Sequence, residues 1–327
     1  MKVVVDDKIP YLQTPLRSIV EEVVALPASD ITPEVVRDAD ALIVRTRTQI
    51  GKPLLEGSRV RFVATATIGY DHIDTAYCLS HGVAWTNAPG CNASSVCQYV
   101  ECALRLMERE GFISISGSTL GIVGVGHVGS LVKSMAERLG MRVLCCDPPL
   151  QEAAGKEGVS EFVPLSQLAE RCDVITFHVP LTSVGHYATY HLADAAFFAS
   201  LERKPLFINT SRGAVTDTKA LKQALLSGQI RQAVIDVWEG EPNVDLELLR
   251  MARITTPHIA GYSADGKARA SQMSLDALCR FFSLPRVSAE QPPLAEQPYD
   301  IDADSRRLKA APASFEYLRN HYPIRRE

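Results

Sequence analysis

The chain has 327 residues, which is too long for one ordinary domain and favours two. Hydrophobic residues make up 46% and charged residues 22%, so there are enough apolar side chains to form globular cores. A net charge of −4, with no stripe of Lys or Arg, argues against nucleic acid as a partner. No apolar run approaches the roughly 18–20 residues that cross a bilayer, and the first residues lack a signal-peptide pattern. We therefore expect a cytoplasmic protein with no membrane segment.

The eight cysteines form no C-x-x-C pair with the spacing of a metal site. Cys145 and Cys146 are neighbours inside an expected strand. We therefore expect reduced, mostly buried thiols and no metal, as is usual for a cytosolic enzyme.

The first part of the chain contains short β-type runs separated by polar or amphipathic stretches of helical length. The runs are VVVD at 3–6, VVAL at 23–26, ALIVR at 41–45, FVATAT at 62–67 and VAWTN at 83–87. This alternation predicts a βα repeat around a parallel sheet. The segment 87–90 breaks the pattern, and a helix with one apolar face is expected from about Asn92.

A second βα series follows, and a helix is expected over roughly residues 264–283. The strands of this series are expected at 120–125, 142–147, 173–179, 205–211, 232–238 and 253–259. The simplest α/β architecture is two doubly wound, parallel-sheet lobes with a cleft between them. From 284 the sequence is rich in Pro, Glu and Gln, which predicts an extended linker, followed by a helical stretch over 312–322.

A glycine-rich segment stands between an expected strand and an expected helix. In GIVGVGHVG, Gly124, Gly126 and Gly129 have the spacing G-x-G-x-x-G. The first glycine permits a tight turn, the second lets the backbone approach a pyrophosphate, and the third brings helix and strand together. The helix start, with His127 and Val128, would then donate N–H groups to the phosphates.

Asp147 follows at the end of the next expected strand. A carboxylate in this place accepts hydrogen bonds from the adenosine ribose, and it would repel a 2′-phosphate. The glycines alone could form a mere tight turn, but the combination with Asp147 favours a dinucleotide site. The cofactor is therefore expected to be NAD.

Three short motifs each follow an expected strand of the second series. They are SRG at 211–213, DVWEGEP at 236–242 and PHIAGY at 257–262. Open α/β sheets bind ligands at the carboxyl ends of their strands, so Arg212, Glu241 and His258 are expected to converge there.

These three residue types suit hydride transfer from a carbon that bears a hydroxyl. His258 can take the hydroxyl proton, Glu241 can hold one imidazole nitrogen, and Arg212 offers a planar fork to a carboxylate. Taken singly, each could be structural: a satisfied histidine, a surface acid or a surface arginine. Their order behind a nucleotide motif favours the catalytic interpretation.

GIVGVGHVG, NTSRGAVTDT, IDVWEGEP and TPHIAGYSADGKARA together resemble the D-isomer-specific 2-hydroxyacid dehydrogenases over roughly residues 1–283. The resemblance implies a flavodoxin-like substrate-binding domain formed by 1–91 and 264–283. It also implies a Rossmann NAD-binding domain over 92–263.

Further segments narrow the resemblance to members that oxidise a small phosphorylated 2-hydroxy acid on the route to pyridoxal phosphate. These segments are ATATIGYDHID, NAPGCNASSV, CDPP and the C-terminal YDIDADSRRLKAAPASFEYLRNHYPIRRE. For residues 284–327 the resemblance implies a linker and a dimerisation tail, and therefore a homodimer.

The resemblance also implies roles for single residues. Arg212, Glu241 and His258 match the active-site arginine, glutamate and proton-donating histidine. The cofactor contacts are expected at Gly124, Gly126, His127, Val128, Gly129, Asp147, Val179, Thr210, Asp236 and Gly261. Thr46, Thr67 and Tyr262 match substrate contacts. Thr46 stands where better-known members have serine, and it keeps the hydroxyl. Val179 stands where some members have threonine, so at this position only a contact through the main chain can remain.

A phosphate on the substrate would need donors other than Arg212, which is occupied by the carboxyl end. Arg45, Thr46 and Arg47 follow the run ALIVR and are the best candidates. Strand alternation would point Arg45 and Arg47 away from Thr46 unless the strand has already ended. The alternative is that Arg45 forms a structural salt bridge and Arg47 is solvated.

Two other functions fit less well. One is another enzyme of the superfamily, such as a 3-phosphoglycerate dehydrogenase or a hydroxypyruvate/glyoxylate reductase. The other is an NAD-sensing co-repressor or scaffold with the same fold. The intact Arg–Glu–His set, and the absence of basic or low-complexity tails, favour an enzyme.

Overall fold

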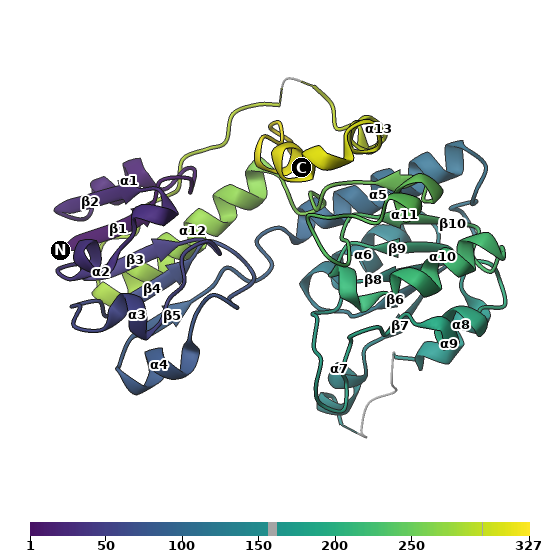
Figure 1. The fold of residues 1–327 in the computed structure, drawn as a ribbon, viewed down its shortest axis with the longest axis horizontal. Helices are drawn as coiled ribbons and strands as arrows, with labels where there is room; N and C mark the ends of the chain where they lie inside the picture. The colour runs from purple at the N-terminus through teal and green to yellow at the C-terminus, as the bar shows by residue number, and fades with distance from the viewer. Residues whose placement is uncertain (156–161, 296) are drawn as a thin grey trace. The chain divides into compact units, whose positions relative to one another are not determined.

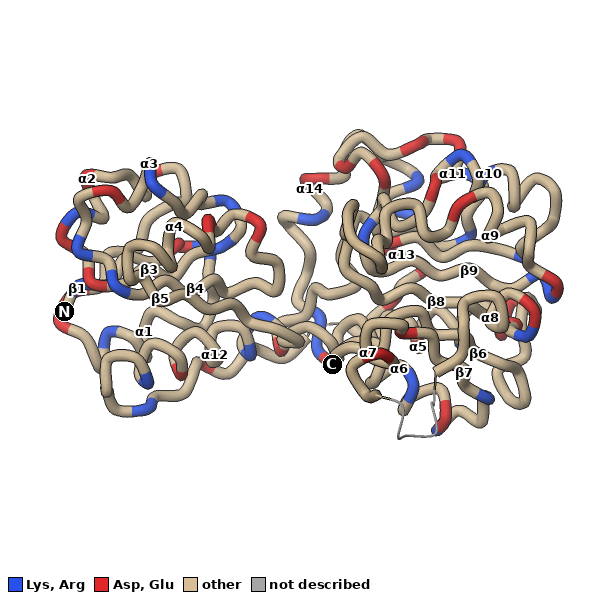
Figure 2. Tube along the Cα trace, turned by 90° about the horizontal axis from the view of Figure 1, so that it is seen from below, with Lys and Arg blue, Asp and Glu red and all other residues tan. Residues whose placement is uncertain are grey.

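The computed structural model describes residues 1–155, 162–295 and 297–327, which form two compact units (Figure 1). Unit 1 comprises Met1–Asn92, Tyr262–Glu296 and Ile324–Glu327, and unit 2 comprises Ala93–Gly261 and Gln297–Pro323. The segment 284–327 is therefore divided between the two units. Basic and acidic residues are interspersed along the trace of each unit (Figure 2).

Unit 1 contains a five-stranded parallel sheet in the order β2-β1-β3-β4-β5. Its strands are β1 Lys2–Asp6, β2 Glu22–Leu26, β3 Ala41–Val44, β4 Phe62–Thr65 and β5 Ala84–Thr86. Its helices are α1 Gln13–Arg17, α2 Pro33–Val36, α3 Lys52–Leu55, α4 Thr75–Ser80 and α12 Ala264–Phe282, with a 3-10 turn at Ala28–Asp30. Strands β3 and β4 are buried throughout, as continuous apolar runs predict for a parallel sheet covered on both faces.

Helix α12 brings a distant part of the sequence back to unit 1. Leu275 and Leu278 of this helix are fully buried in the same cluster as Val5 and Phe62 of the sheet. Unit 1 is therefore assembled from both ends of the chain, and the prediction of two parallel-sheet α/β lobes is confirmed.

Unit 2 contains a six-stranded parallel sheet in the order β11-β10-β9-β8-β6-β7. Its strands are β6 Thr119–Val123, β7 Arg142–Cys146, β8 Val174–Phe177, β9 Leu206–Asn209, β10 Gln232–Ile235 and β11 Ile254–Thr255. Its helices are α5 Ala93–Arg109, α6 His127–Arg138, α7 Pro148–Ala153, α8 Leu165–Arg171, α9 Ala195–Ala199, α10 Thr218–Leu226, α11 Leu246–Met251, α13 Ile301–Ala310 and α14 Phe315–Asn320, with 3-10 turns at Gly213–Val215 and Pro312–Ser314. The chain order reverses between β6 and β8, which is where doubly wound sheets bind ligands.

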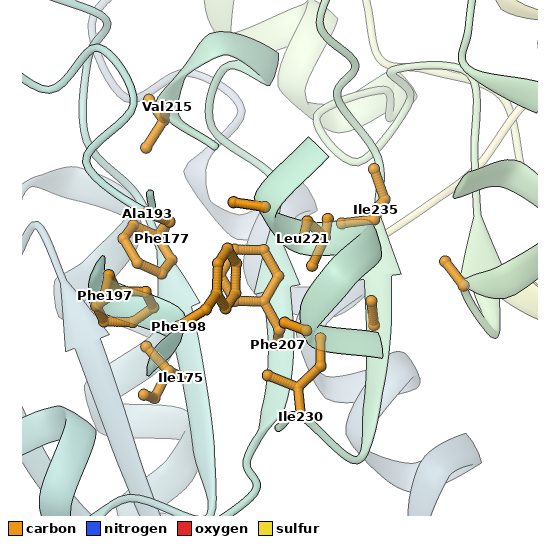
Figure 3. Close-up of a cluster of buried hydrophobic side chains, with 14 of the residues drawn as sticks. Ile175, Phe177, Ala193, Phe197, Phe198, Phe207, Val215, Leu221, Ile230 and Ile235 are labelled. Atoms are coloured by element: carbon orange, nitrogen blue, oxygen red, sulfur yellow. The ribbon is translucent and has the colours of Figure 1, made fainter. Parts of the chain in front are cut away.

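Alternate residues of the unit 2 strands enter two separate cores. Ile208 and Val234 pack with helices α5 and α6, whereas Phe207 and Ile235 pack with α8 to α11. Figure 3 shows the second core, in which the rings of Phe177 and Phe207 lie 5.3 Å apart between centroids. Burial on both faces fixes the register of these strands, because a one-residue slip would exchange the two cores.

The strands that precede the expected catalytic motifs are shorter than the sequence predicted. The runs expected at 205–211, 232–238 and 253–259 end at Asn209, Ile235 and Thr255. Beyond these points some backbone N–H groups donate to side chains, although those of Asp236 and Thr256 still donate to the neighbouring strands. For example, the N–H of Ser211 donates to the side-chain oxygen of Asn209 at 3.0 Å.

Helix α13 was not predicted, because residues 284–300 were interpreted as a linker leading to a later helical stretch. Asp300 caps it by accepting hydrogen bonds from the N–H groups of Asp302 and Ala303, both at 3.0 Å. Ser305 of this helix accepts the N–H of Thr255 at 3.0 Å, so α13 covers the edge strand β11. Arg253 also binds α13 through an ion pair with Asp302 at 2.8 Å.

All eight cysteines lie in the described residues and are free thiols, six of them buried. Among the described helices, none has the length and apolar character of a membrane-spanning segment. The described residues also contain no group of three or more His, Cys, Asp or Glu arranged to hold a metal ion.

Candidate active site

Glu241 and His258 form a hydrogen-bonded pair in the loops that follow β10 and β11. Nδ1 of His258 lies 2.8 Å from Oε2 of Glu241, and the backbone N–H of Trp238 donates to Oε1 at 2.9 Å. A carboxylate only accepts hydrogen bonds, so Nδ1 of the imidazole carries a hydrogen. The neutral ring therefore keeps a lone pair on Nε2, which is the nitrogen that can take a proton.

The electrostatics of Glu241 favour its charged form. Burial acts to raise the pKa of this carboxyl, and the hydrogen bond and charge of His258 act to lower it. The Trp238 N–H and the positive charge of Arg319 act in the same direction, so the pKa lies below its ordinary value. Glu241 is thus ionised whenever His258 has to become positively charged.

Asp236 shapes the loop that carries His258. Its buried carboxylate accepts three hydrogen bonds: from the Thr256 hydroxyl at 2.6 Å, from Ile259 N–H at 2.8 Å and from Ala260 N–H at 2.9 Å. Its carbonyl accepts the N–H of His258 at 2.8 Å. His258 has φ of 56°, a left-handed conformation that is unfavourable for this residue type and persists where its surroundings impose it. Burial raises the pKa of Asp236, although these donors and His258 oppose the shift.

Arg212 stands at the start of the turn that follows β9. It is exposed, and its Nη1 donates to the carbonyl of Ser211 at 2.8 Å. Within the described residues its guanidinium has no ion-pair partner, so its charge is available to an anionic ligand. The neighbouring Gly213 has no room for a side chain, because an added Cβ would lie 2.0 Å from the carbonyl carbon of Trp238. The Arg212 turn is therefore in direct backbone contact with the loop that holds Glu241.

Glu239 and Glu241 are separated by one residue but have different partners. Oε1 of Glu239 lies 2.7 Å from Nε2 of His191, and its other oxygen accepts the N–H of Thr218 at 3.2 Å. Glu239 is therefore a structural acid, and Glu241 alone is paired with His258.

The three glycines of the nucleotide motif have three different environments. Gly124 has φ of 88°, and an added Cβ would lie 2.7 Å from Cγ1 of Val179. At Gly129 an added Cβ would lie 2.1 Å from the carbonyl oxygen of Gly124. Gly126 faces open space, with no atom within 4 Å of such a Cβ, and it is the N-cap of α6. A pyrophosphate fits this arrangement, because the backbone is accessible at Gly126 next to the helix start at His127 and Val128.

Asp147 links the glycine-rich turn to the next helix. Its carboxylate accepts the N–H of Val125 at 2.8 Å and the N–H of Leu150 at 3.1 Å. Pro148 and Pro149 occupy the first positions of α7. Each carboxylate oxygen keeps a lone pair with which to bind a ribose hydroxyl.

His178 lies between two expected cofactor contacts, Val179 and Thr210, but it was not predicted from the sequence. Its Nε2 lies 3.0 Å from the hydroxyl of Thr176, and its Nδ1 lies 3.3 Å from the hydroxyl of Thr210. Burial lowers the pKa of His178 to about 3, so the ring is neutral. It joins the end of β8, next to Val179, to the end of β9. Its position directly after the strand VITF is the only sequence signal that could have identified it.

Arg45 in unit 1 forms the structural ion pair that the sequence analysis gave as its alternative. Nε and Nη2 donate to the two oxygens of Asp6 at 2.9 and 3.0 Å, and Asp6 is fully buried. Strand β3 ends at Val44, so strand alternation does not govern the residues after it. Thr46 and Arg47 are exposed.

Thr67 is held by a short hydrogen-bond chain. Its hydroxyl lies 2.7 Å from that of Thr65 and donates to the carbonyl of Gly69 at 3.0 Å. Nε2 of His72 lies 3.1 Å from the Thr65 hydroxyl. Tyr262, in the same unit, has the ammonium of Lys267 over its ring, 5.4 Å from the centroid.

The residues at 102–260 match the family model described as D-isomer specific 2-hydroxyacid dehydrogenase, NAD binding domain. Erythronate-4-phosphate dehydrogenase of Bacteroides fragilis is 52% identical, over 100% of this chain and 97% of the relative. The enzymes of the same name from Porphyromonas gingivalis and Escherichia coli O157:H7 are 46% and 41% identical, over 100% of this chain and 94% and 92% of theirs. The chain belongs to the erythronate-4-phosphate dehydrogenase family.

Solved structures of the wider superfamily share the fold. D-lactate dehydrogenase of Aquifex aeolicus, complexed with NAD and lactic acid, has a TM-score of 0.67 at 25% identity and covers 86% of this chain and 96% of its own. The NAD+-bound 3-phosphoglycerate dehydrogenase of Entamoeba histolytica has a TM-score of 0.68 at 26% identity and covers 86% and 95%. The family and the NAD-binding domain predicted from the motifs are thereby confirmed.

The C-terminal part of this family member lies beside the His258 loop within unit 2. Pro257 and Ile259, on either side of His258, line a cavity of about 250 Å³. Its other walls come from α13, α14 and the residues after them: Asp304, Arg307, Tyr317, Leu318, His321, Tyr322 and Pro323. Together with the charge of Arg319 acting on Glu241, this packing shows that the tail forms part of the surroundings of the pair.

Proposed function

We propose that the protein oxidises 4-phospho-D-erythronate at C2 with NAD, which gives 2-oxo-3-hydroxy-4-phosphobutanoate on the route to pyridoxal phosphate. The observation that carries this proposal is the 2.8 Å pair of His258 and Glu241 at the carboxyl edge of the sheet that bears the glycine-rich turn. The family relatives named erythronate-4-phosphate dehydrogenase support the choice of substrate.

In this mechanism Arg212 binds the carboxylate and the C2 oxygen through its planar fork. Nε2 of His258 takes the proton of the C2 hydroxyl while the C2 hydrogen departs as hydride, so that C2 becomes a carbonyl. Glu241 stabilises the imidazolium that forms. NAD, when bound, supplies the acceptor of the hydride.

We assign NAD binding, together with Arg212, Glu241 and His258, to unit 2 and the other substrate contacts to unit 1. The proposed cofactor contacts are Gly124, Gly126, His127, Val128, Gly129, Asp147, Val179, Thr210, Asp236 and Gly261. For Asp236 the contact has to coexist with the three donors that already occupy its carboxylate. The proposed substrate contacts in unit 1 are Arg45, Thr46, Thr67 and Tyr262.

We also propose a cytoplasmic homodimer. Residues 284–327 resemble a dimerisation tail, and Tyr317 and Ile324 of this segment are 64% and 47% exposed, so a second copy would cover them in such a dimer. The free thiols fit a reducing compartment. Sedimentation of the purified protein tests the assembly, and a monomer at micromolar concentration would contradict it.

The proposed activity is tested with purified protein and a panel of acids: 4-phosphoerythronate, erythronate, 3-phosphoglycerate, glycerate and lactate. Formation of NADH is followed by its absorbance, with NADP as the alternative oxidant. We expect kcat/KM to be highest for 4-phosphoerythronate with NAD. A higher value for 3-phosphoglycerate or glycerate would assign the protein to another activity of the superfamily, and no turnover of any acid would favour a non-enzymatic role.

A further inference from the structure

Lys267 lies in the first turn of α12 and has no part in the function proposed above. Its ammonium stands over the ring of Tyr262, 5.4 Å from the centroid. Within the part of the chain that the structure describes, this ammonium has no hydrogen bond or ion pair to a carboxylate. It is therefore an exposed positive charge beside a proposed substrate contact, and it is available to a ligand.

Three acidic side chains of unit 1 already have other basic partners. Asp265 binds Nε of Arg326 at 2.9 and 3.0 Å, and Glu327 binds Arg269 at 2.6 Å. Asp6 is occupied by Arg45. None of these three carboxylates therefore forms an ion pair with Lys267.

Three physical effects disfavour a positive charge at this point. Desolvation lowers the pKa of Lys267, and the positive charge of Arg45 lowers it further. The N-terminus of a helix carries a partial positive charge, and α12 has 19 residues. A bound anion would offset these effects by stabilising the charged ammonium, and perturbed ionisable groups without a structural partner are typical of functional sites.

We infer that Lys267 binds the phosphate group of the substrate in unit 1, next to Tyr262 and Arg45. Asp6 neutralises Arg45 and occupies two of its nitrogens, so Lys267 supplies the charge that the sequence analysis assigned to Arg45. A phosphate ester carries a charge of about −1.5 to −2 at pH 7, and the three N–H groups of an ammonium suit its oxygens. This inference rests on the proposed function and adds a specificity residue to it.

The test compares Lys267→Met with Lys267→Arg and with Arg286→Met. Arg286 is an exposed residue of unit 1 whose ion pair with Asp276 lies well along α12, so its loss controls for the change in net charge. Each variant is assayed with 4-phosphoerythronate and with erythronate. Inorganic phosphate is titrated as an inhibitor of erythronate oxidation, and thermal melts check that the fold is retained.

In Lys267→Met we expect kcat/KM for 4-phosphoerythronate to fall about ten- to a hundredfold, mainly through KM. Turnover of erythronate should stay within about twofold, inhibition by phosphate should weaken, and Lys267→Arg should keep most of the preference. An unchanged preference in Lys267→Met, or an equal loss on both substrates, overturns the inference and leaves the proposed activity intact. If the wild type itself does not prefer the 4-phosphate, the proposed substrate is wrong. In that case, an inhibition constant for phosphate that is the same in Lys267→Met and in the wild type would also reject phosphate binding by Lys267.

Discussion

Replacement of Glu241 by glutamine should reverse the hydrogen-bonding direction at His258. The N–H of Trp238 donates to one carboxylate oxygen at 2.9 Å, and His258 meets the other at 2.8 Å. An amide has only one acceptor oxygen, and the Trp238 N–H requires it, so the NH2 group has to face Nδ1 of His258. Nδ1 must then accept, and the neutral imidazole carries its hydrogen on Nε2.

This tautomer lacks the lone pair on Nε2 that takes the substrate proton. The imidazolium that forms in the reaction would also lose its carboxylate partner. Positioned acid–base catalysis contributes about 10²–10⁴-fold, and we expect Glu241→Gln to lose most of that factor in kcat. The substitution preserves shape, so the fold and the binding of NAD should persist.

The assay is NADH formation from 4-phosphoerythronate under saturating conditions over a range of pH, with circular dichroism and NAD titration as checks on folding. Glu239→Gln is the matched control, because it makes the same change in the same loop on an acid that pairs with His191. We expect this control to keep kcat within a few-fold of the wild type. A Glu241→Gln enzyme with a nearly unchanged kcat and pH profile would refute the tautomer argument.

Three further outcomes are expected. Asp147→Ser should narrow the preference for NAD over NADP in kcat/KM, whereas equal use of both by the wild type would refute the role of Asp147. Asp236→Asn should lower the free energy of unfolding in urea by about 1–3 kcal/mol, because its NH2 group would face the N–H of Ala260; an unchanged midpoint would contradict this. Folding lowers the pKa of Glu241, so its carboxylate stabilises the folded state. This contribution is complete above the usual glutamate pKa of about 4.3, and it is lost as the pH falls through the lower pKa of the folded state. The difference in unfolding free energy between the wild type and Glu241→Gln should therefore shrink in acid, and a difference that grows would contradict the sign.

The sequence was sufficient to predict the two parallel sheets. Strand β3, for example, is buried on both faces and is a continuous apolar run. Arg212, Glu241 and His258 were predicted to converge because each follows a parallel strand, and such strands end at the same edge of a sheet. The structure pairs Glu241 with His258 and brings the backbone of the Arg212 turn against the loop that holds Glu241.

Features that depend on contacts between distant residues were not predictable in this way. Asp6 and Arg45 are separated by 39 positions, and only the fold shows that they form an ion pair with each other. Helix α13 buries few apolar side chains, Ile301 and Leu308 among them, so it lacks a hydrophobic period. Its local signal was Asp300 at the N-cap, which is weak without an apolar stripe behind it.

The absence of a side chain at Gly213 has a consequence for anyone who wishes to redirect this enzyme to new acids by mutagenesis. The turn bearing Arg212 touches the main chain at Trp238, so any other residue at 213 forces the neighbouring loop to shift. Libraries that randomise either loop alone would mostly sample misplaced catalytic groups. Productive variants should come from exchanging both loops as one module, with the glycine held constant.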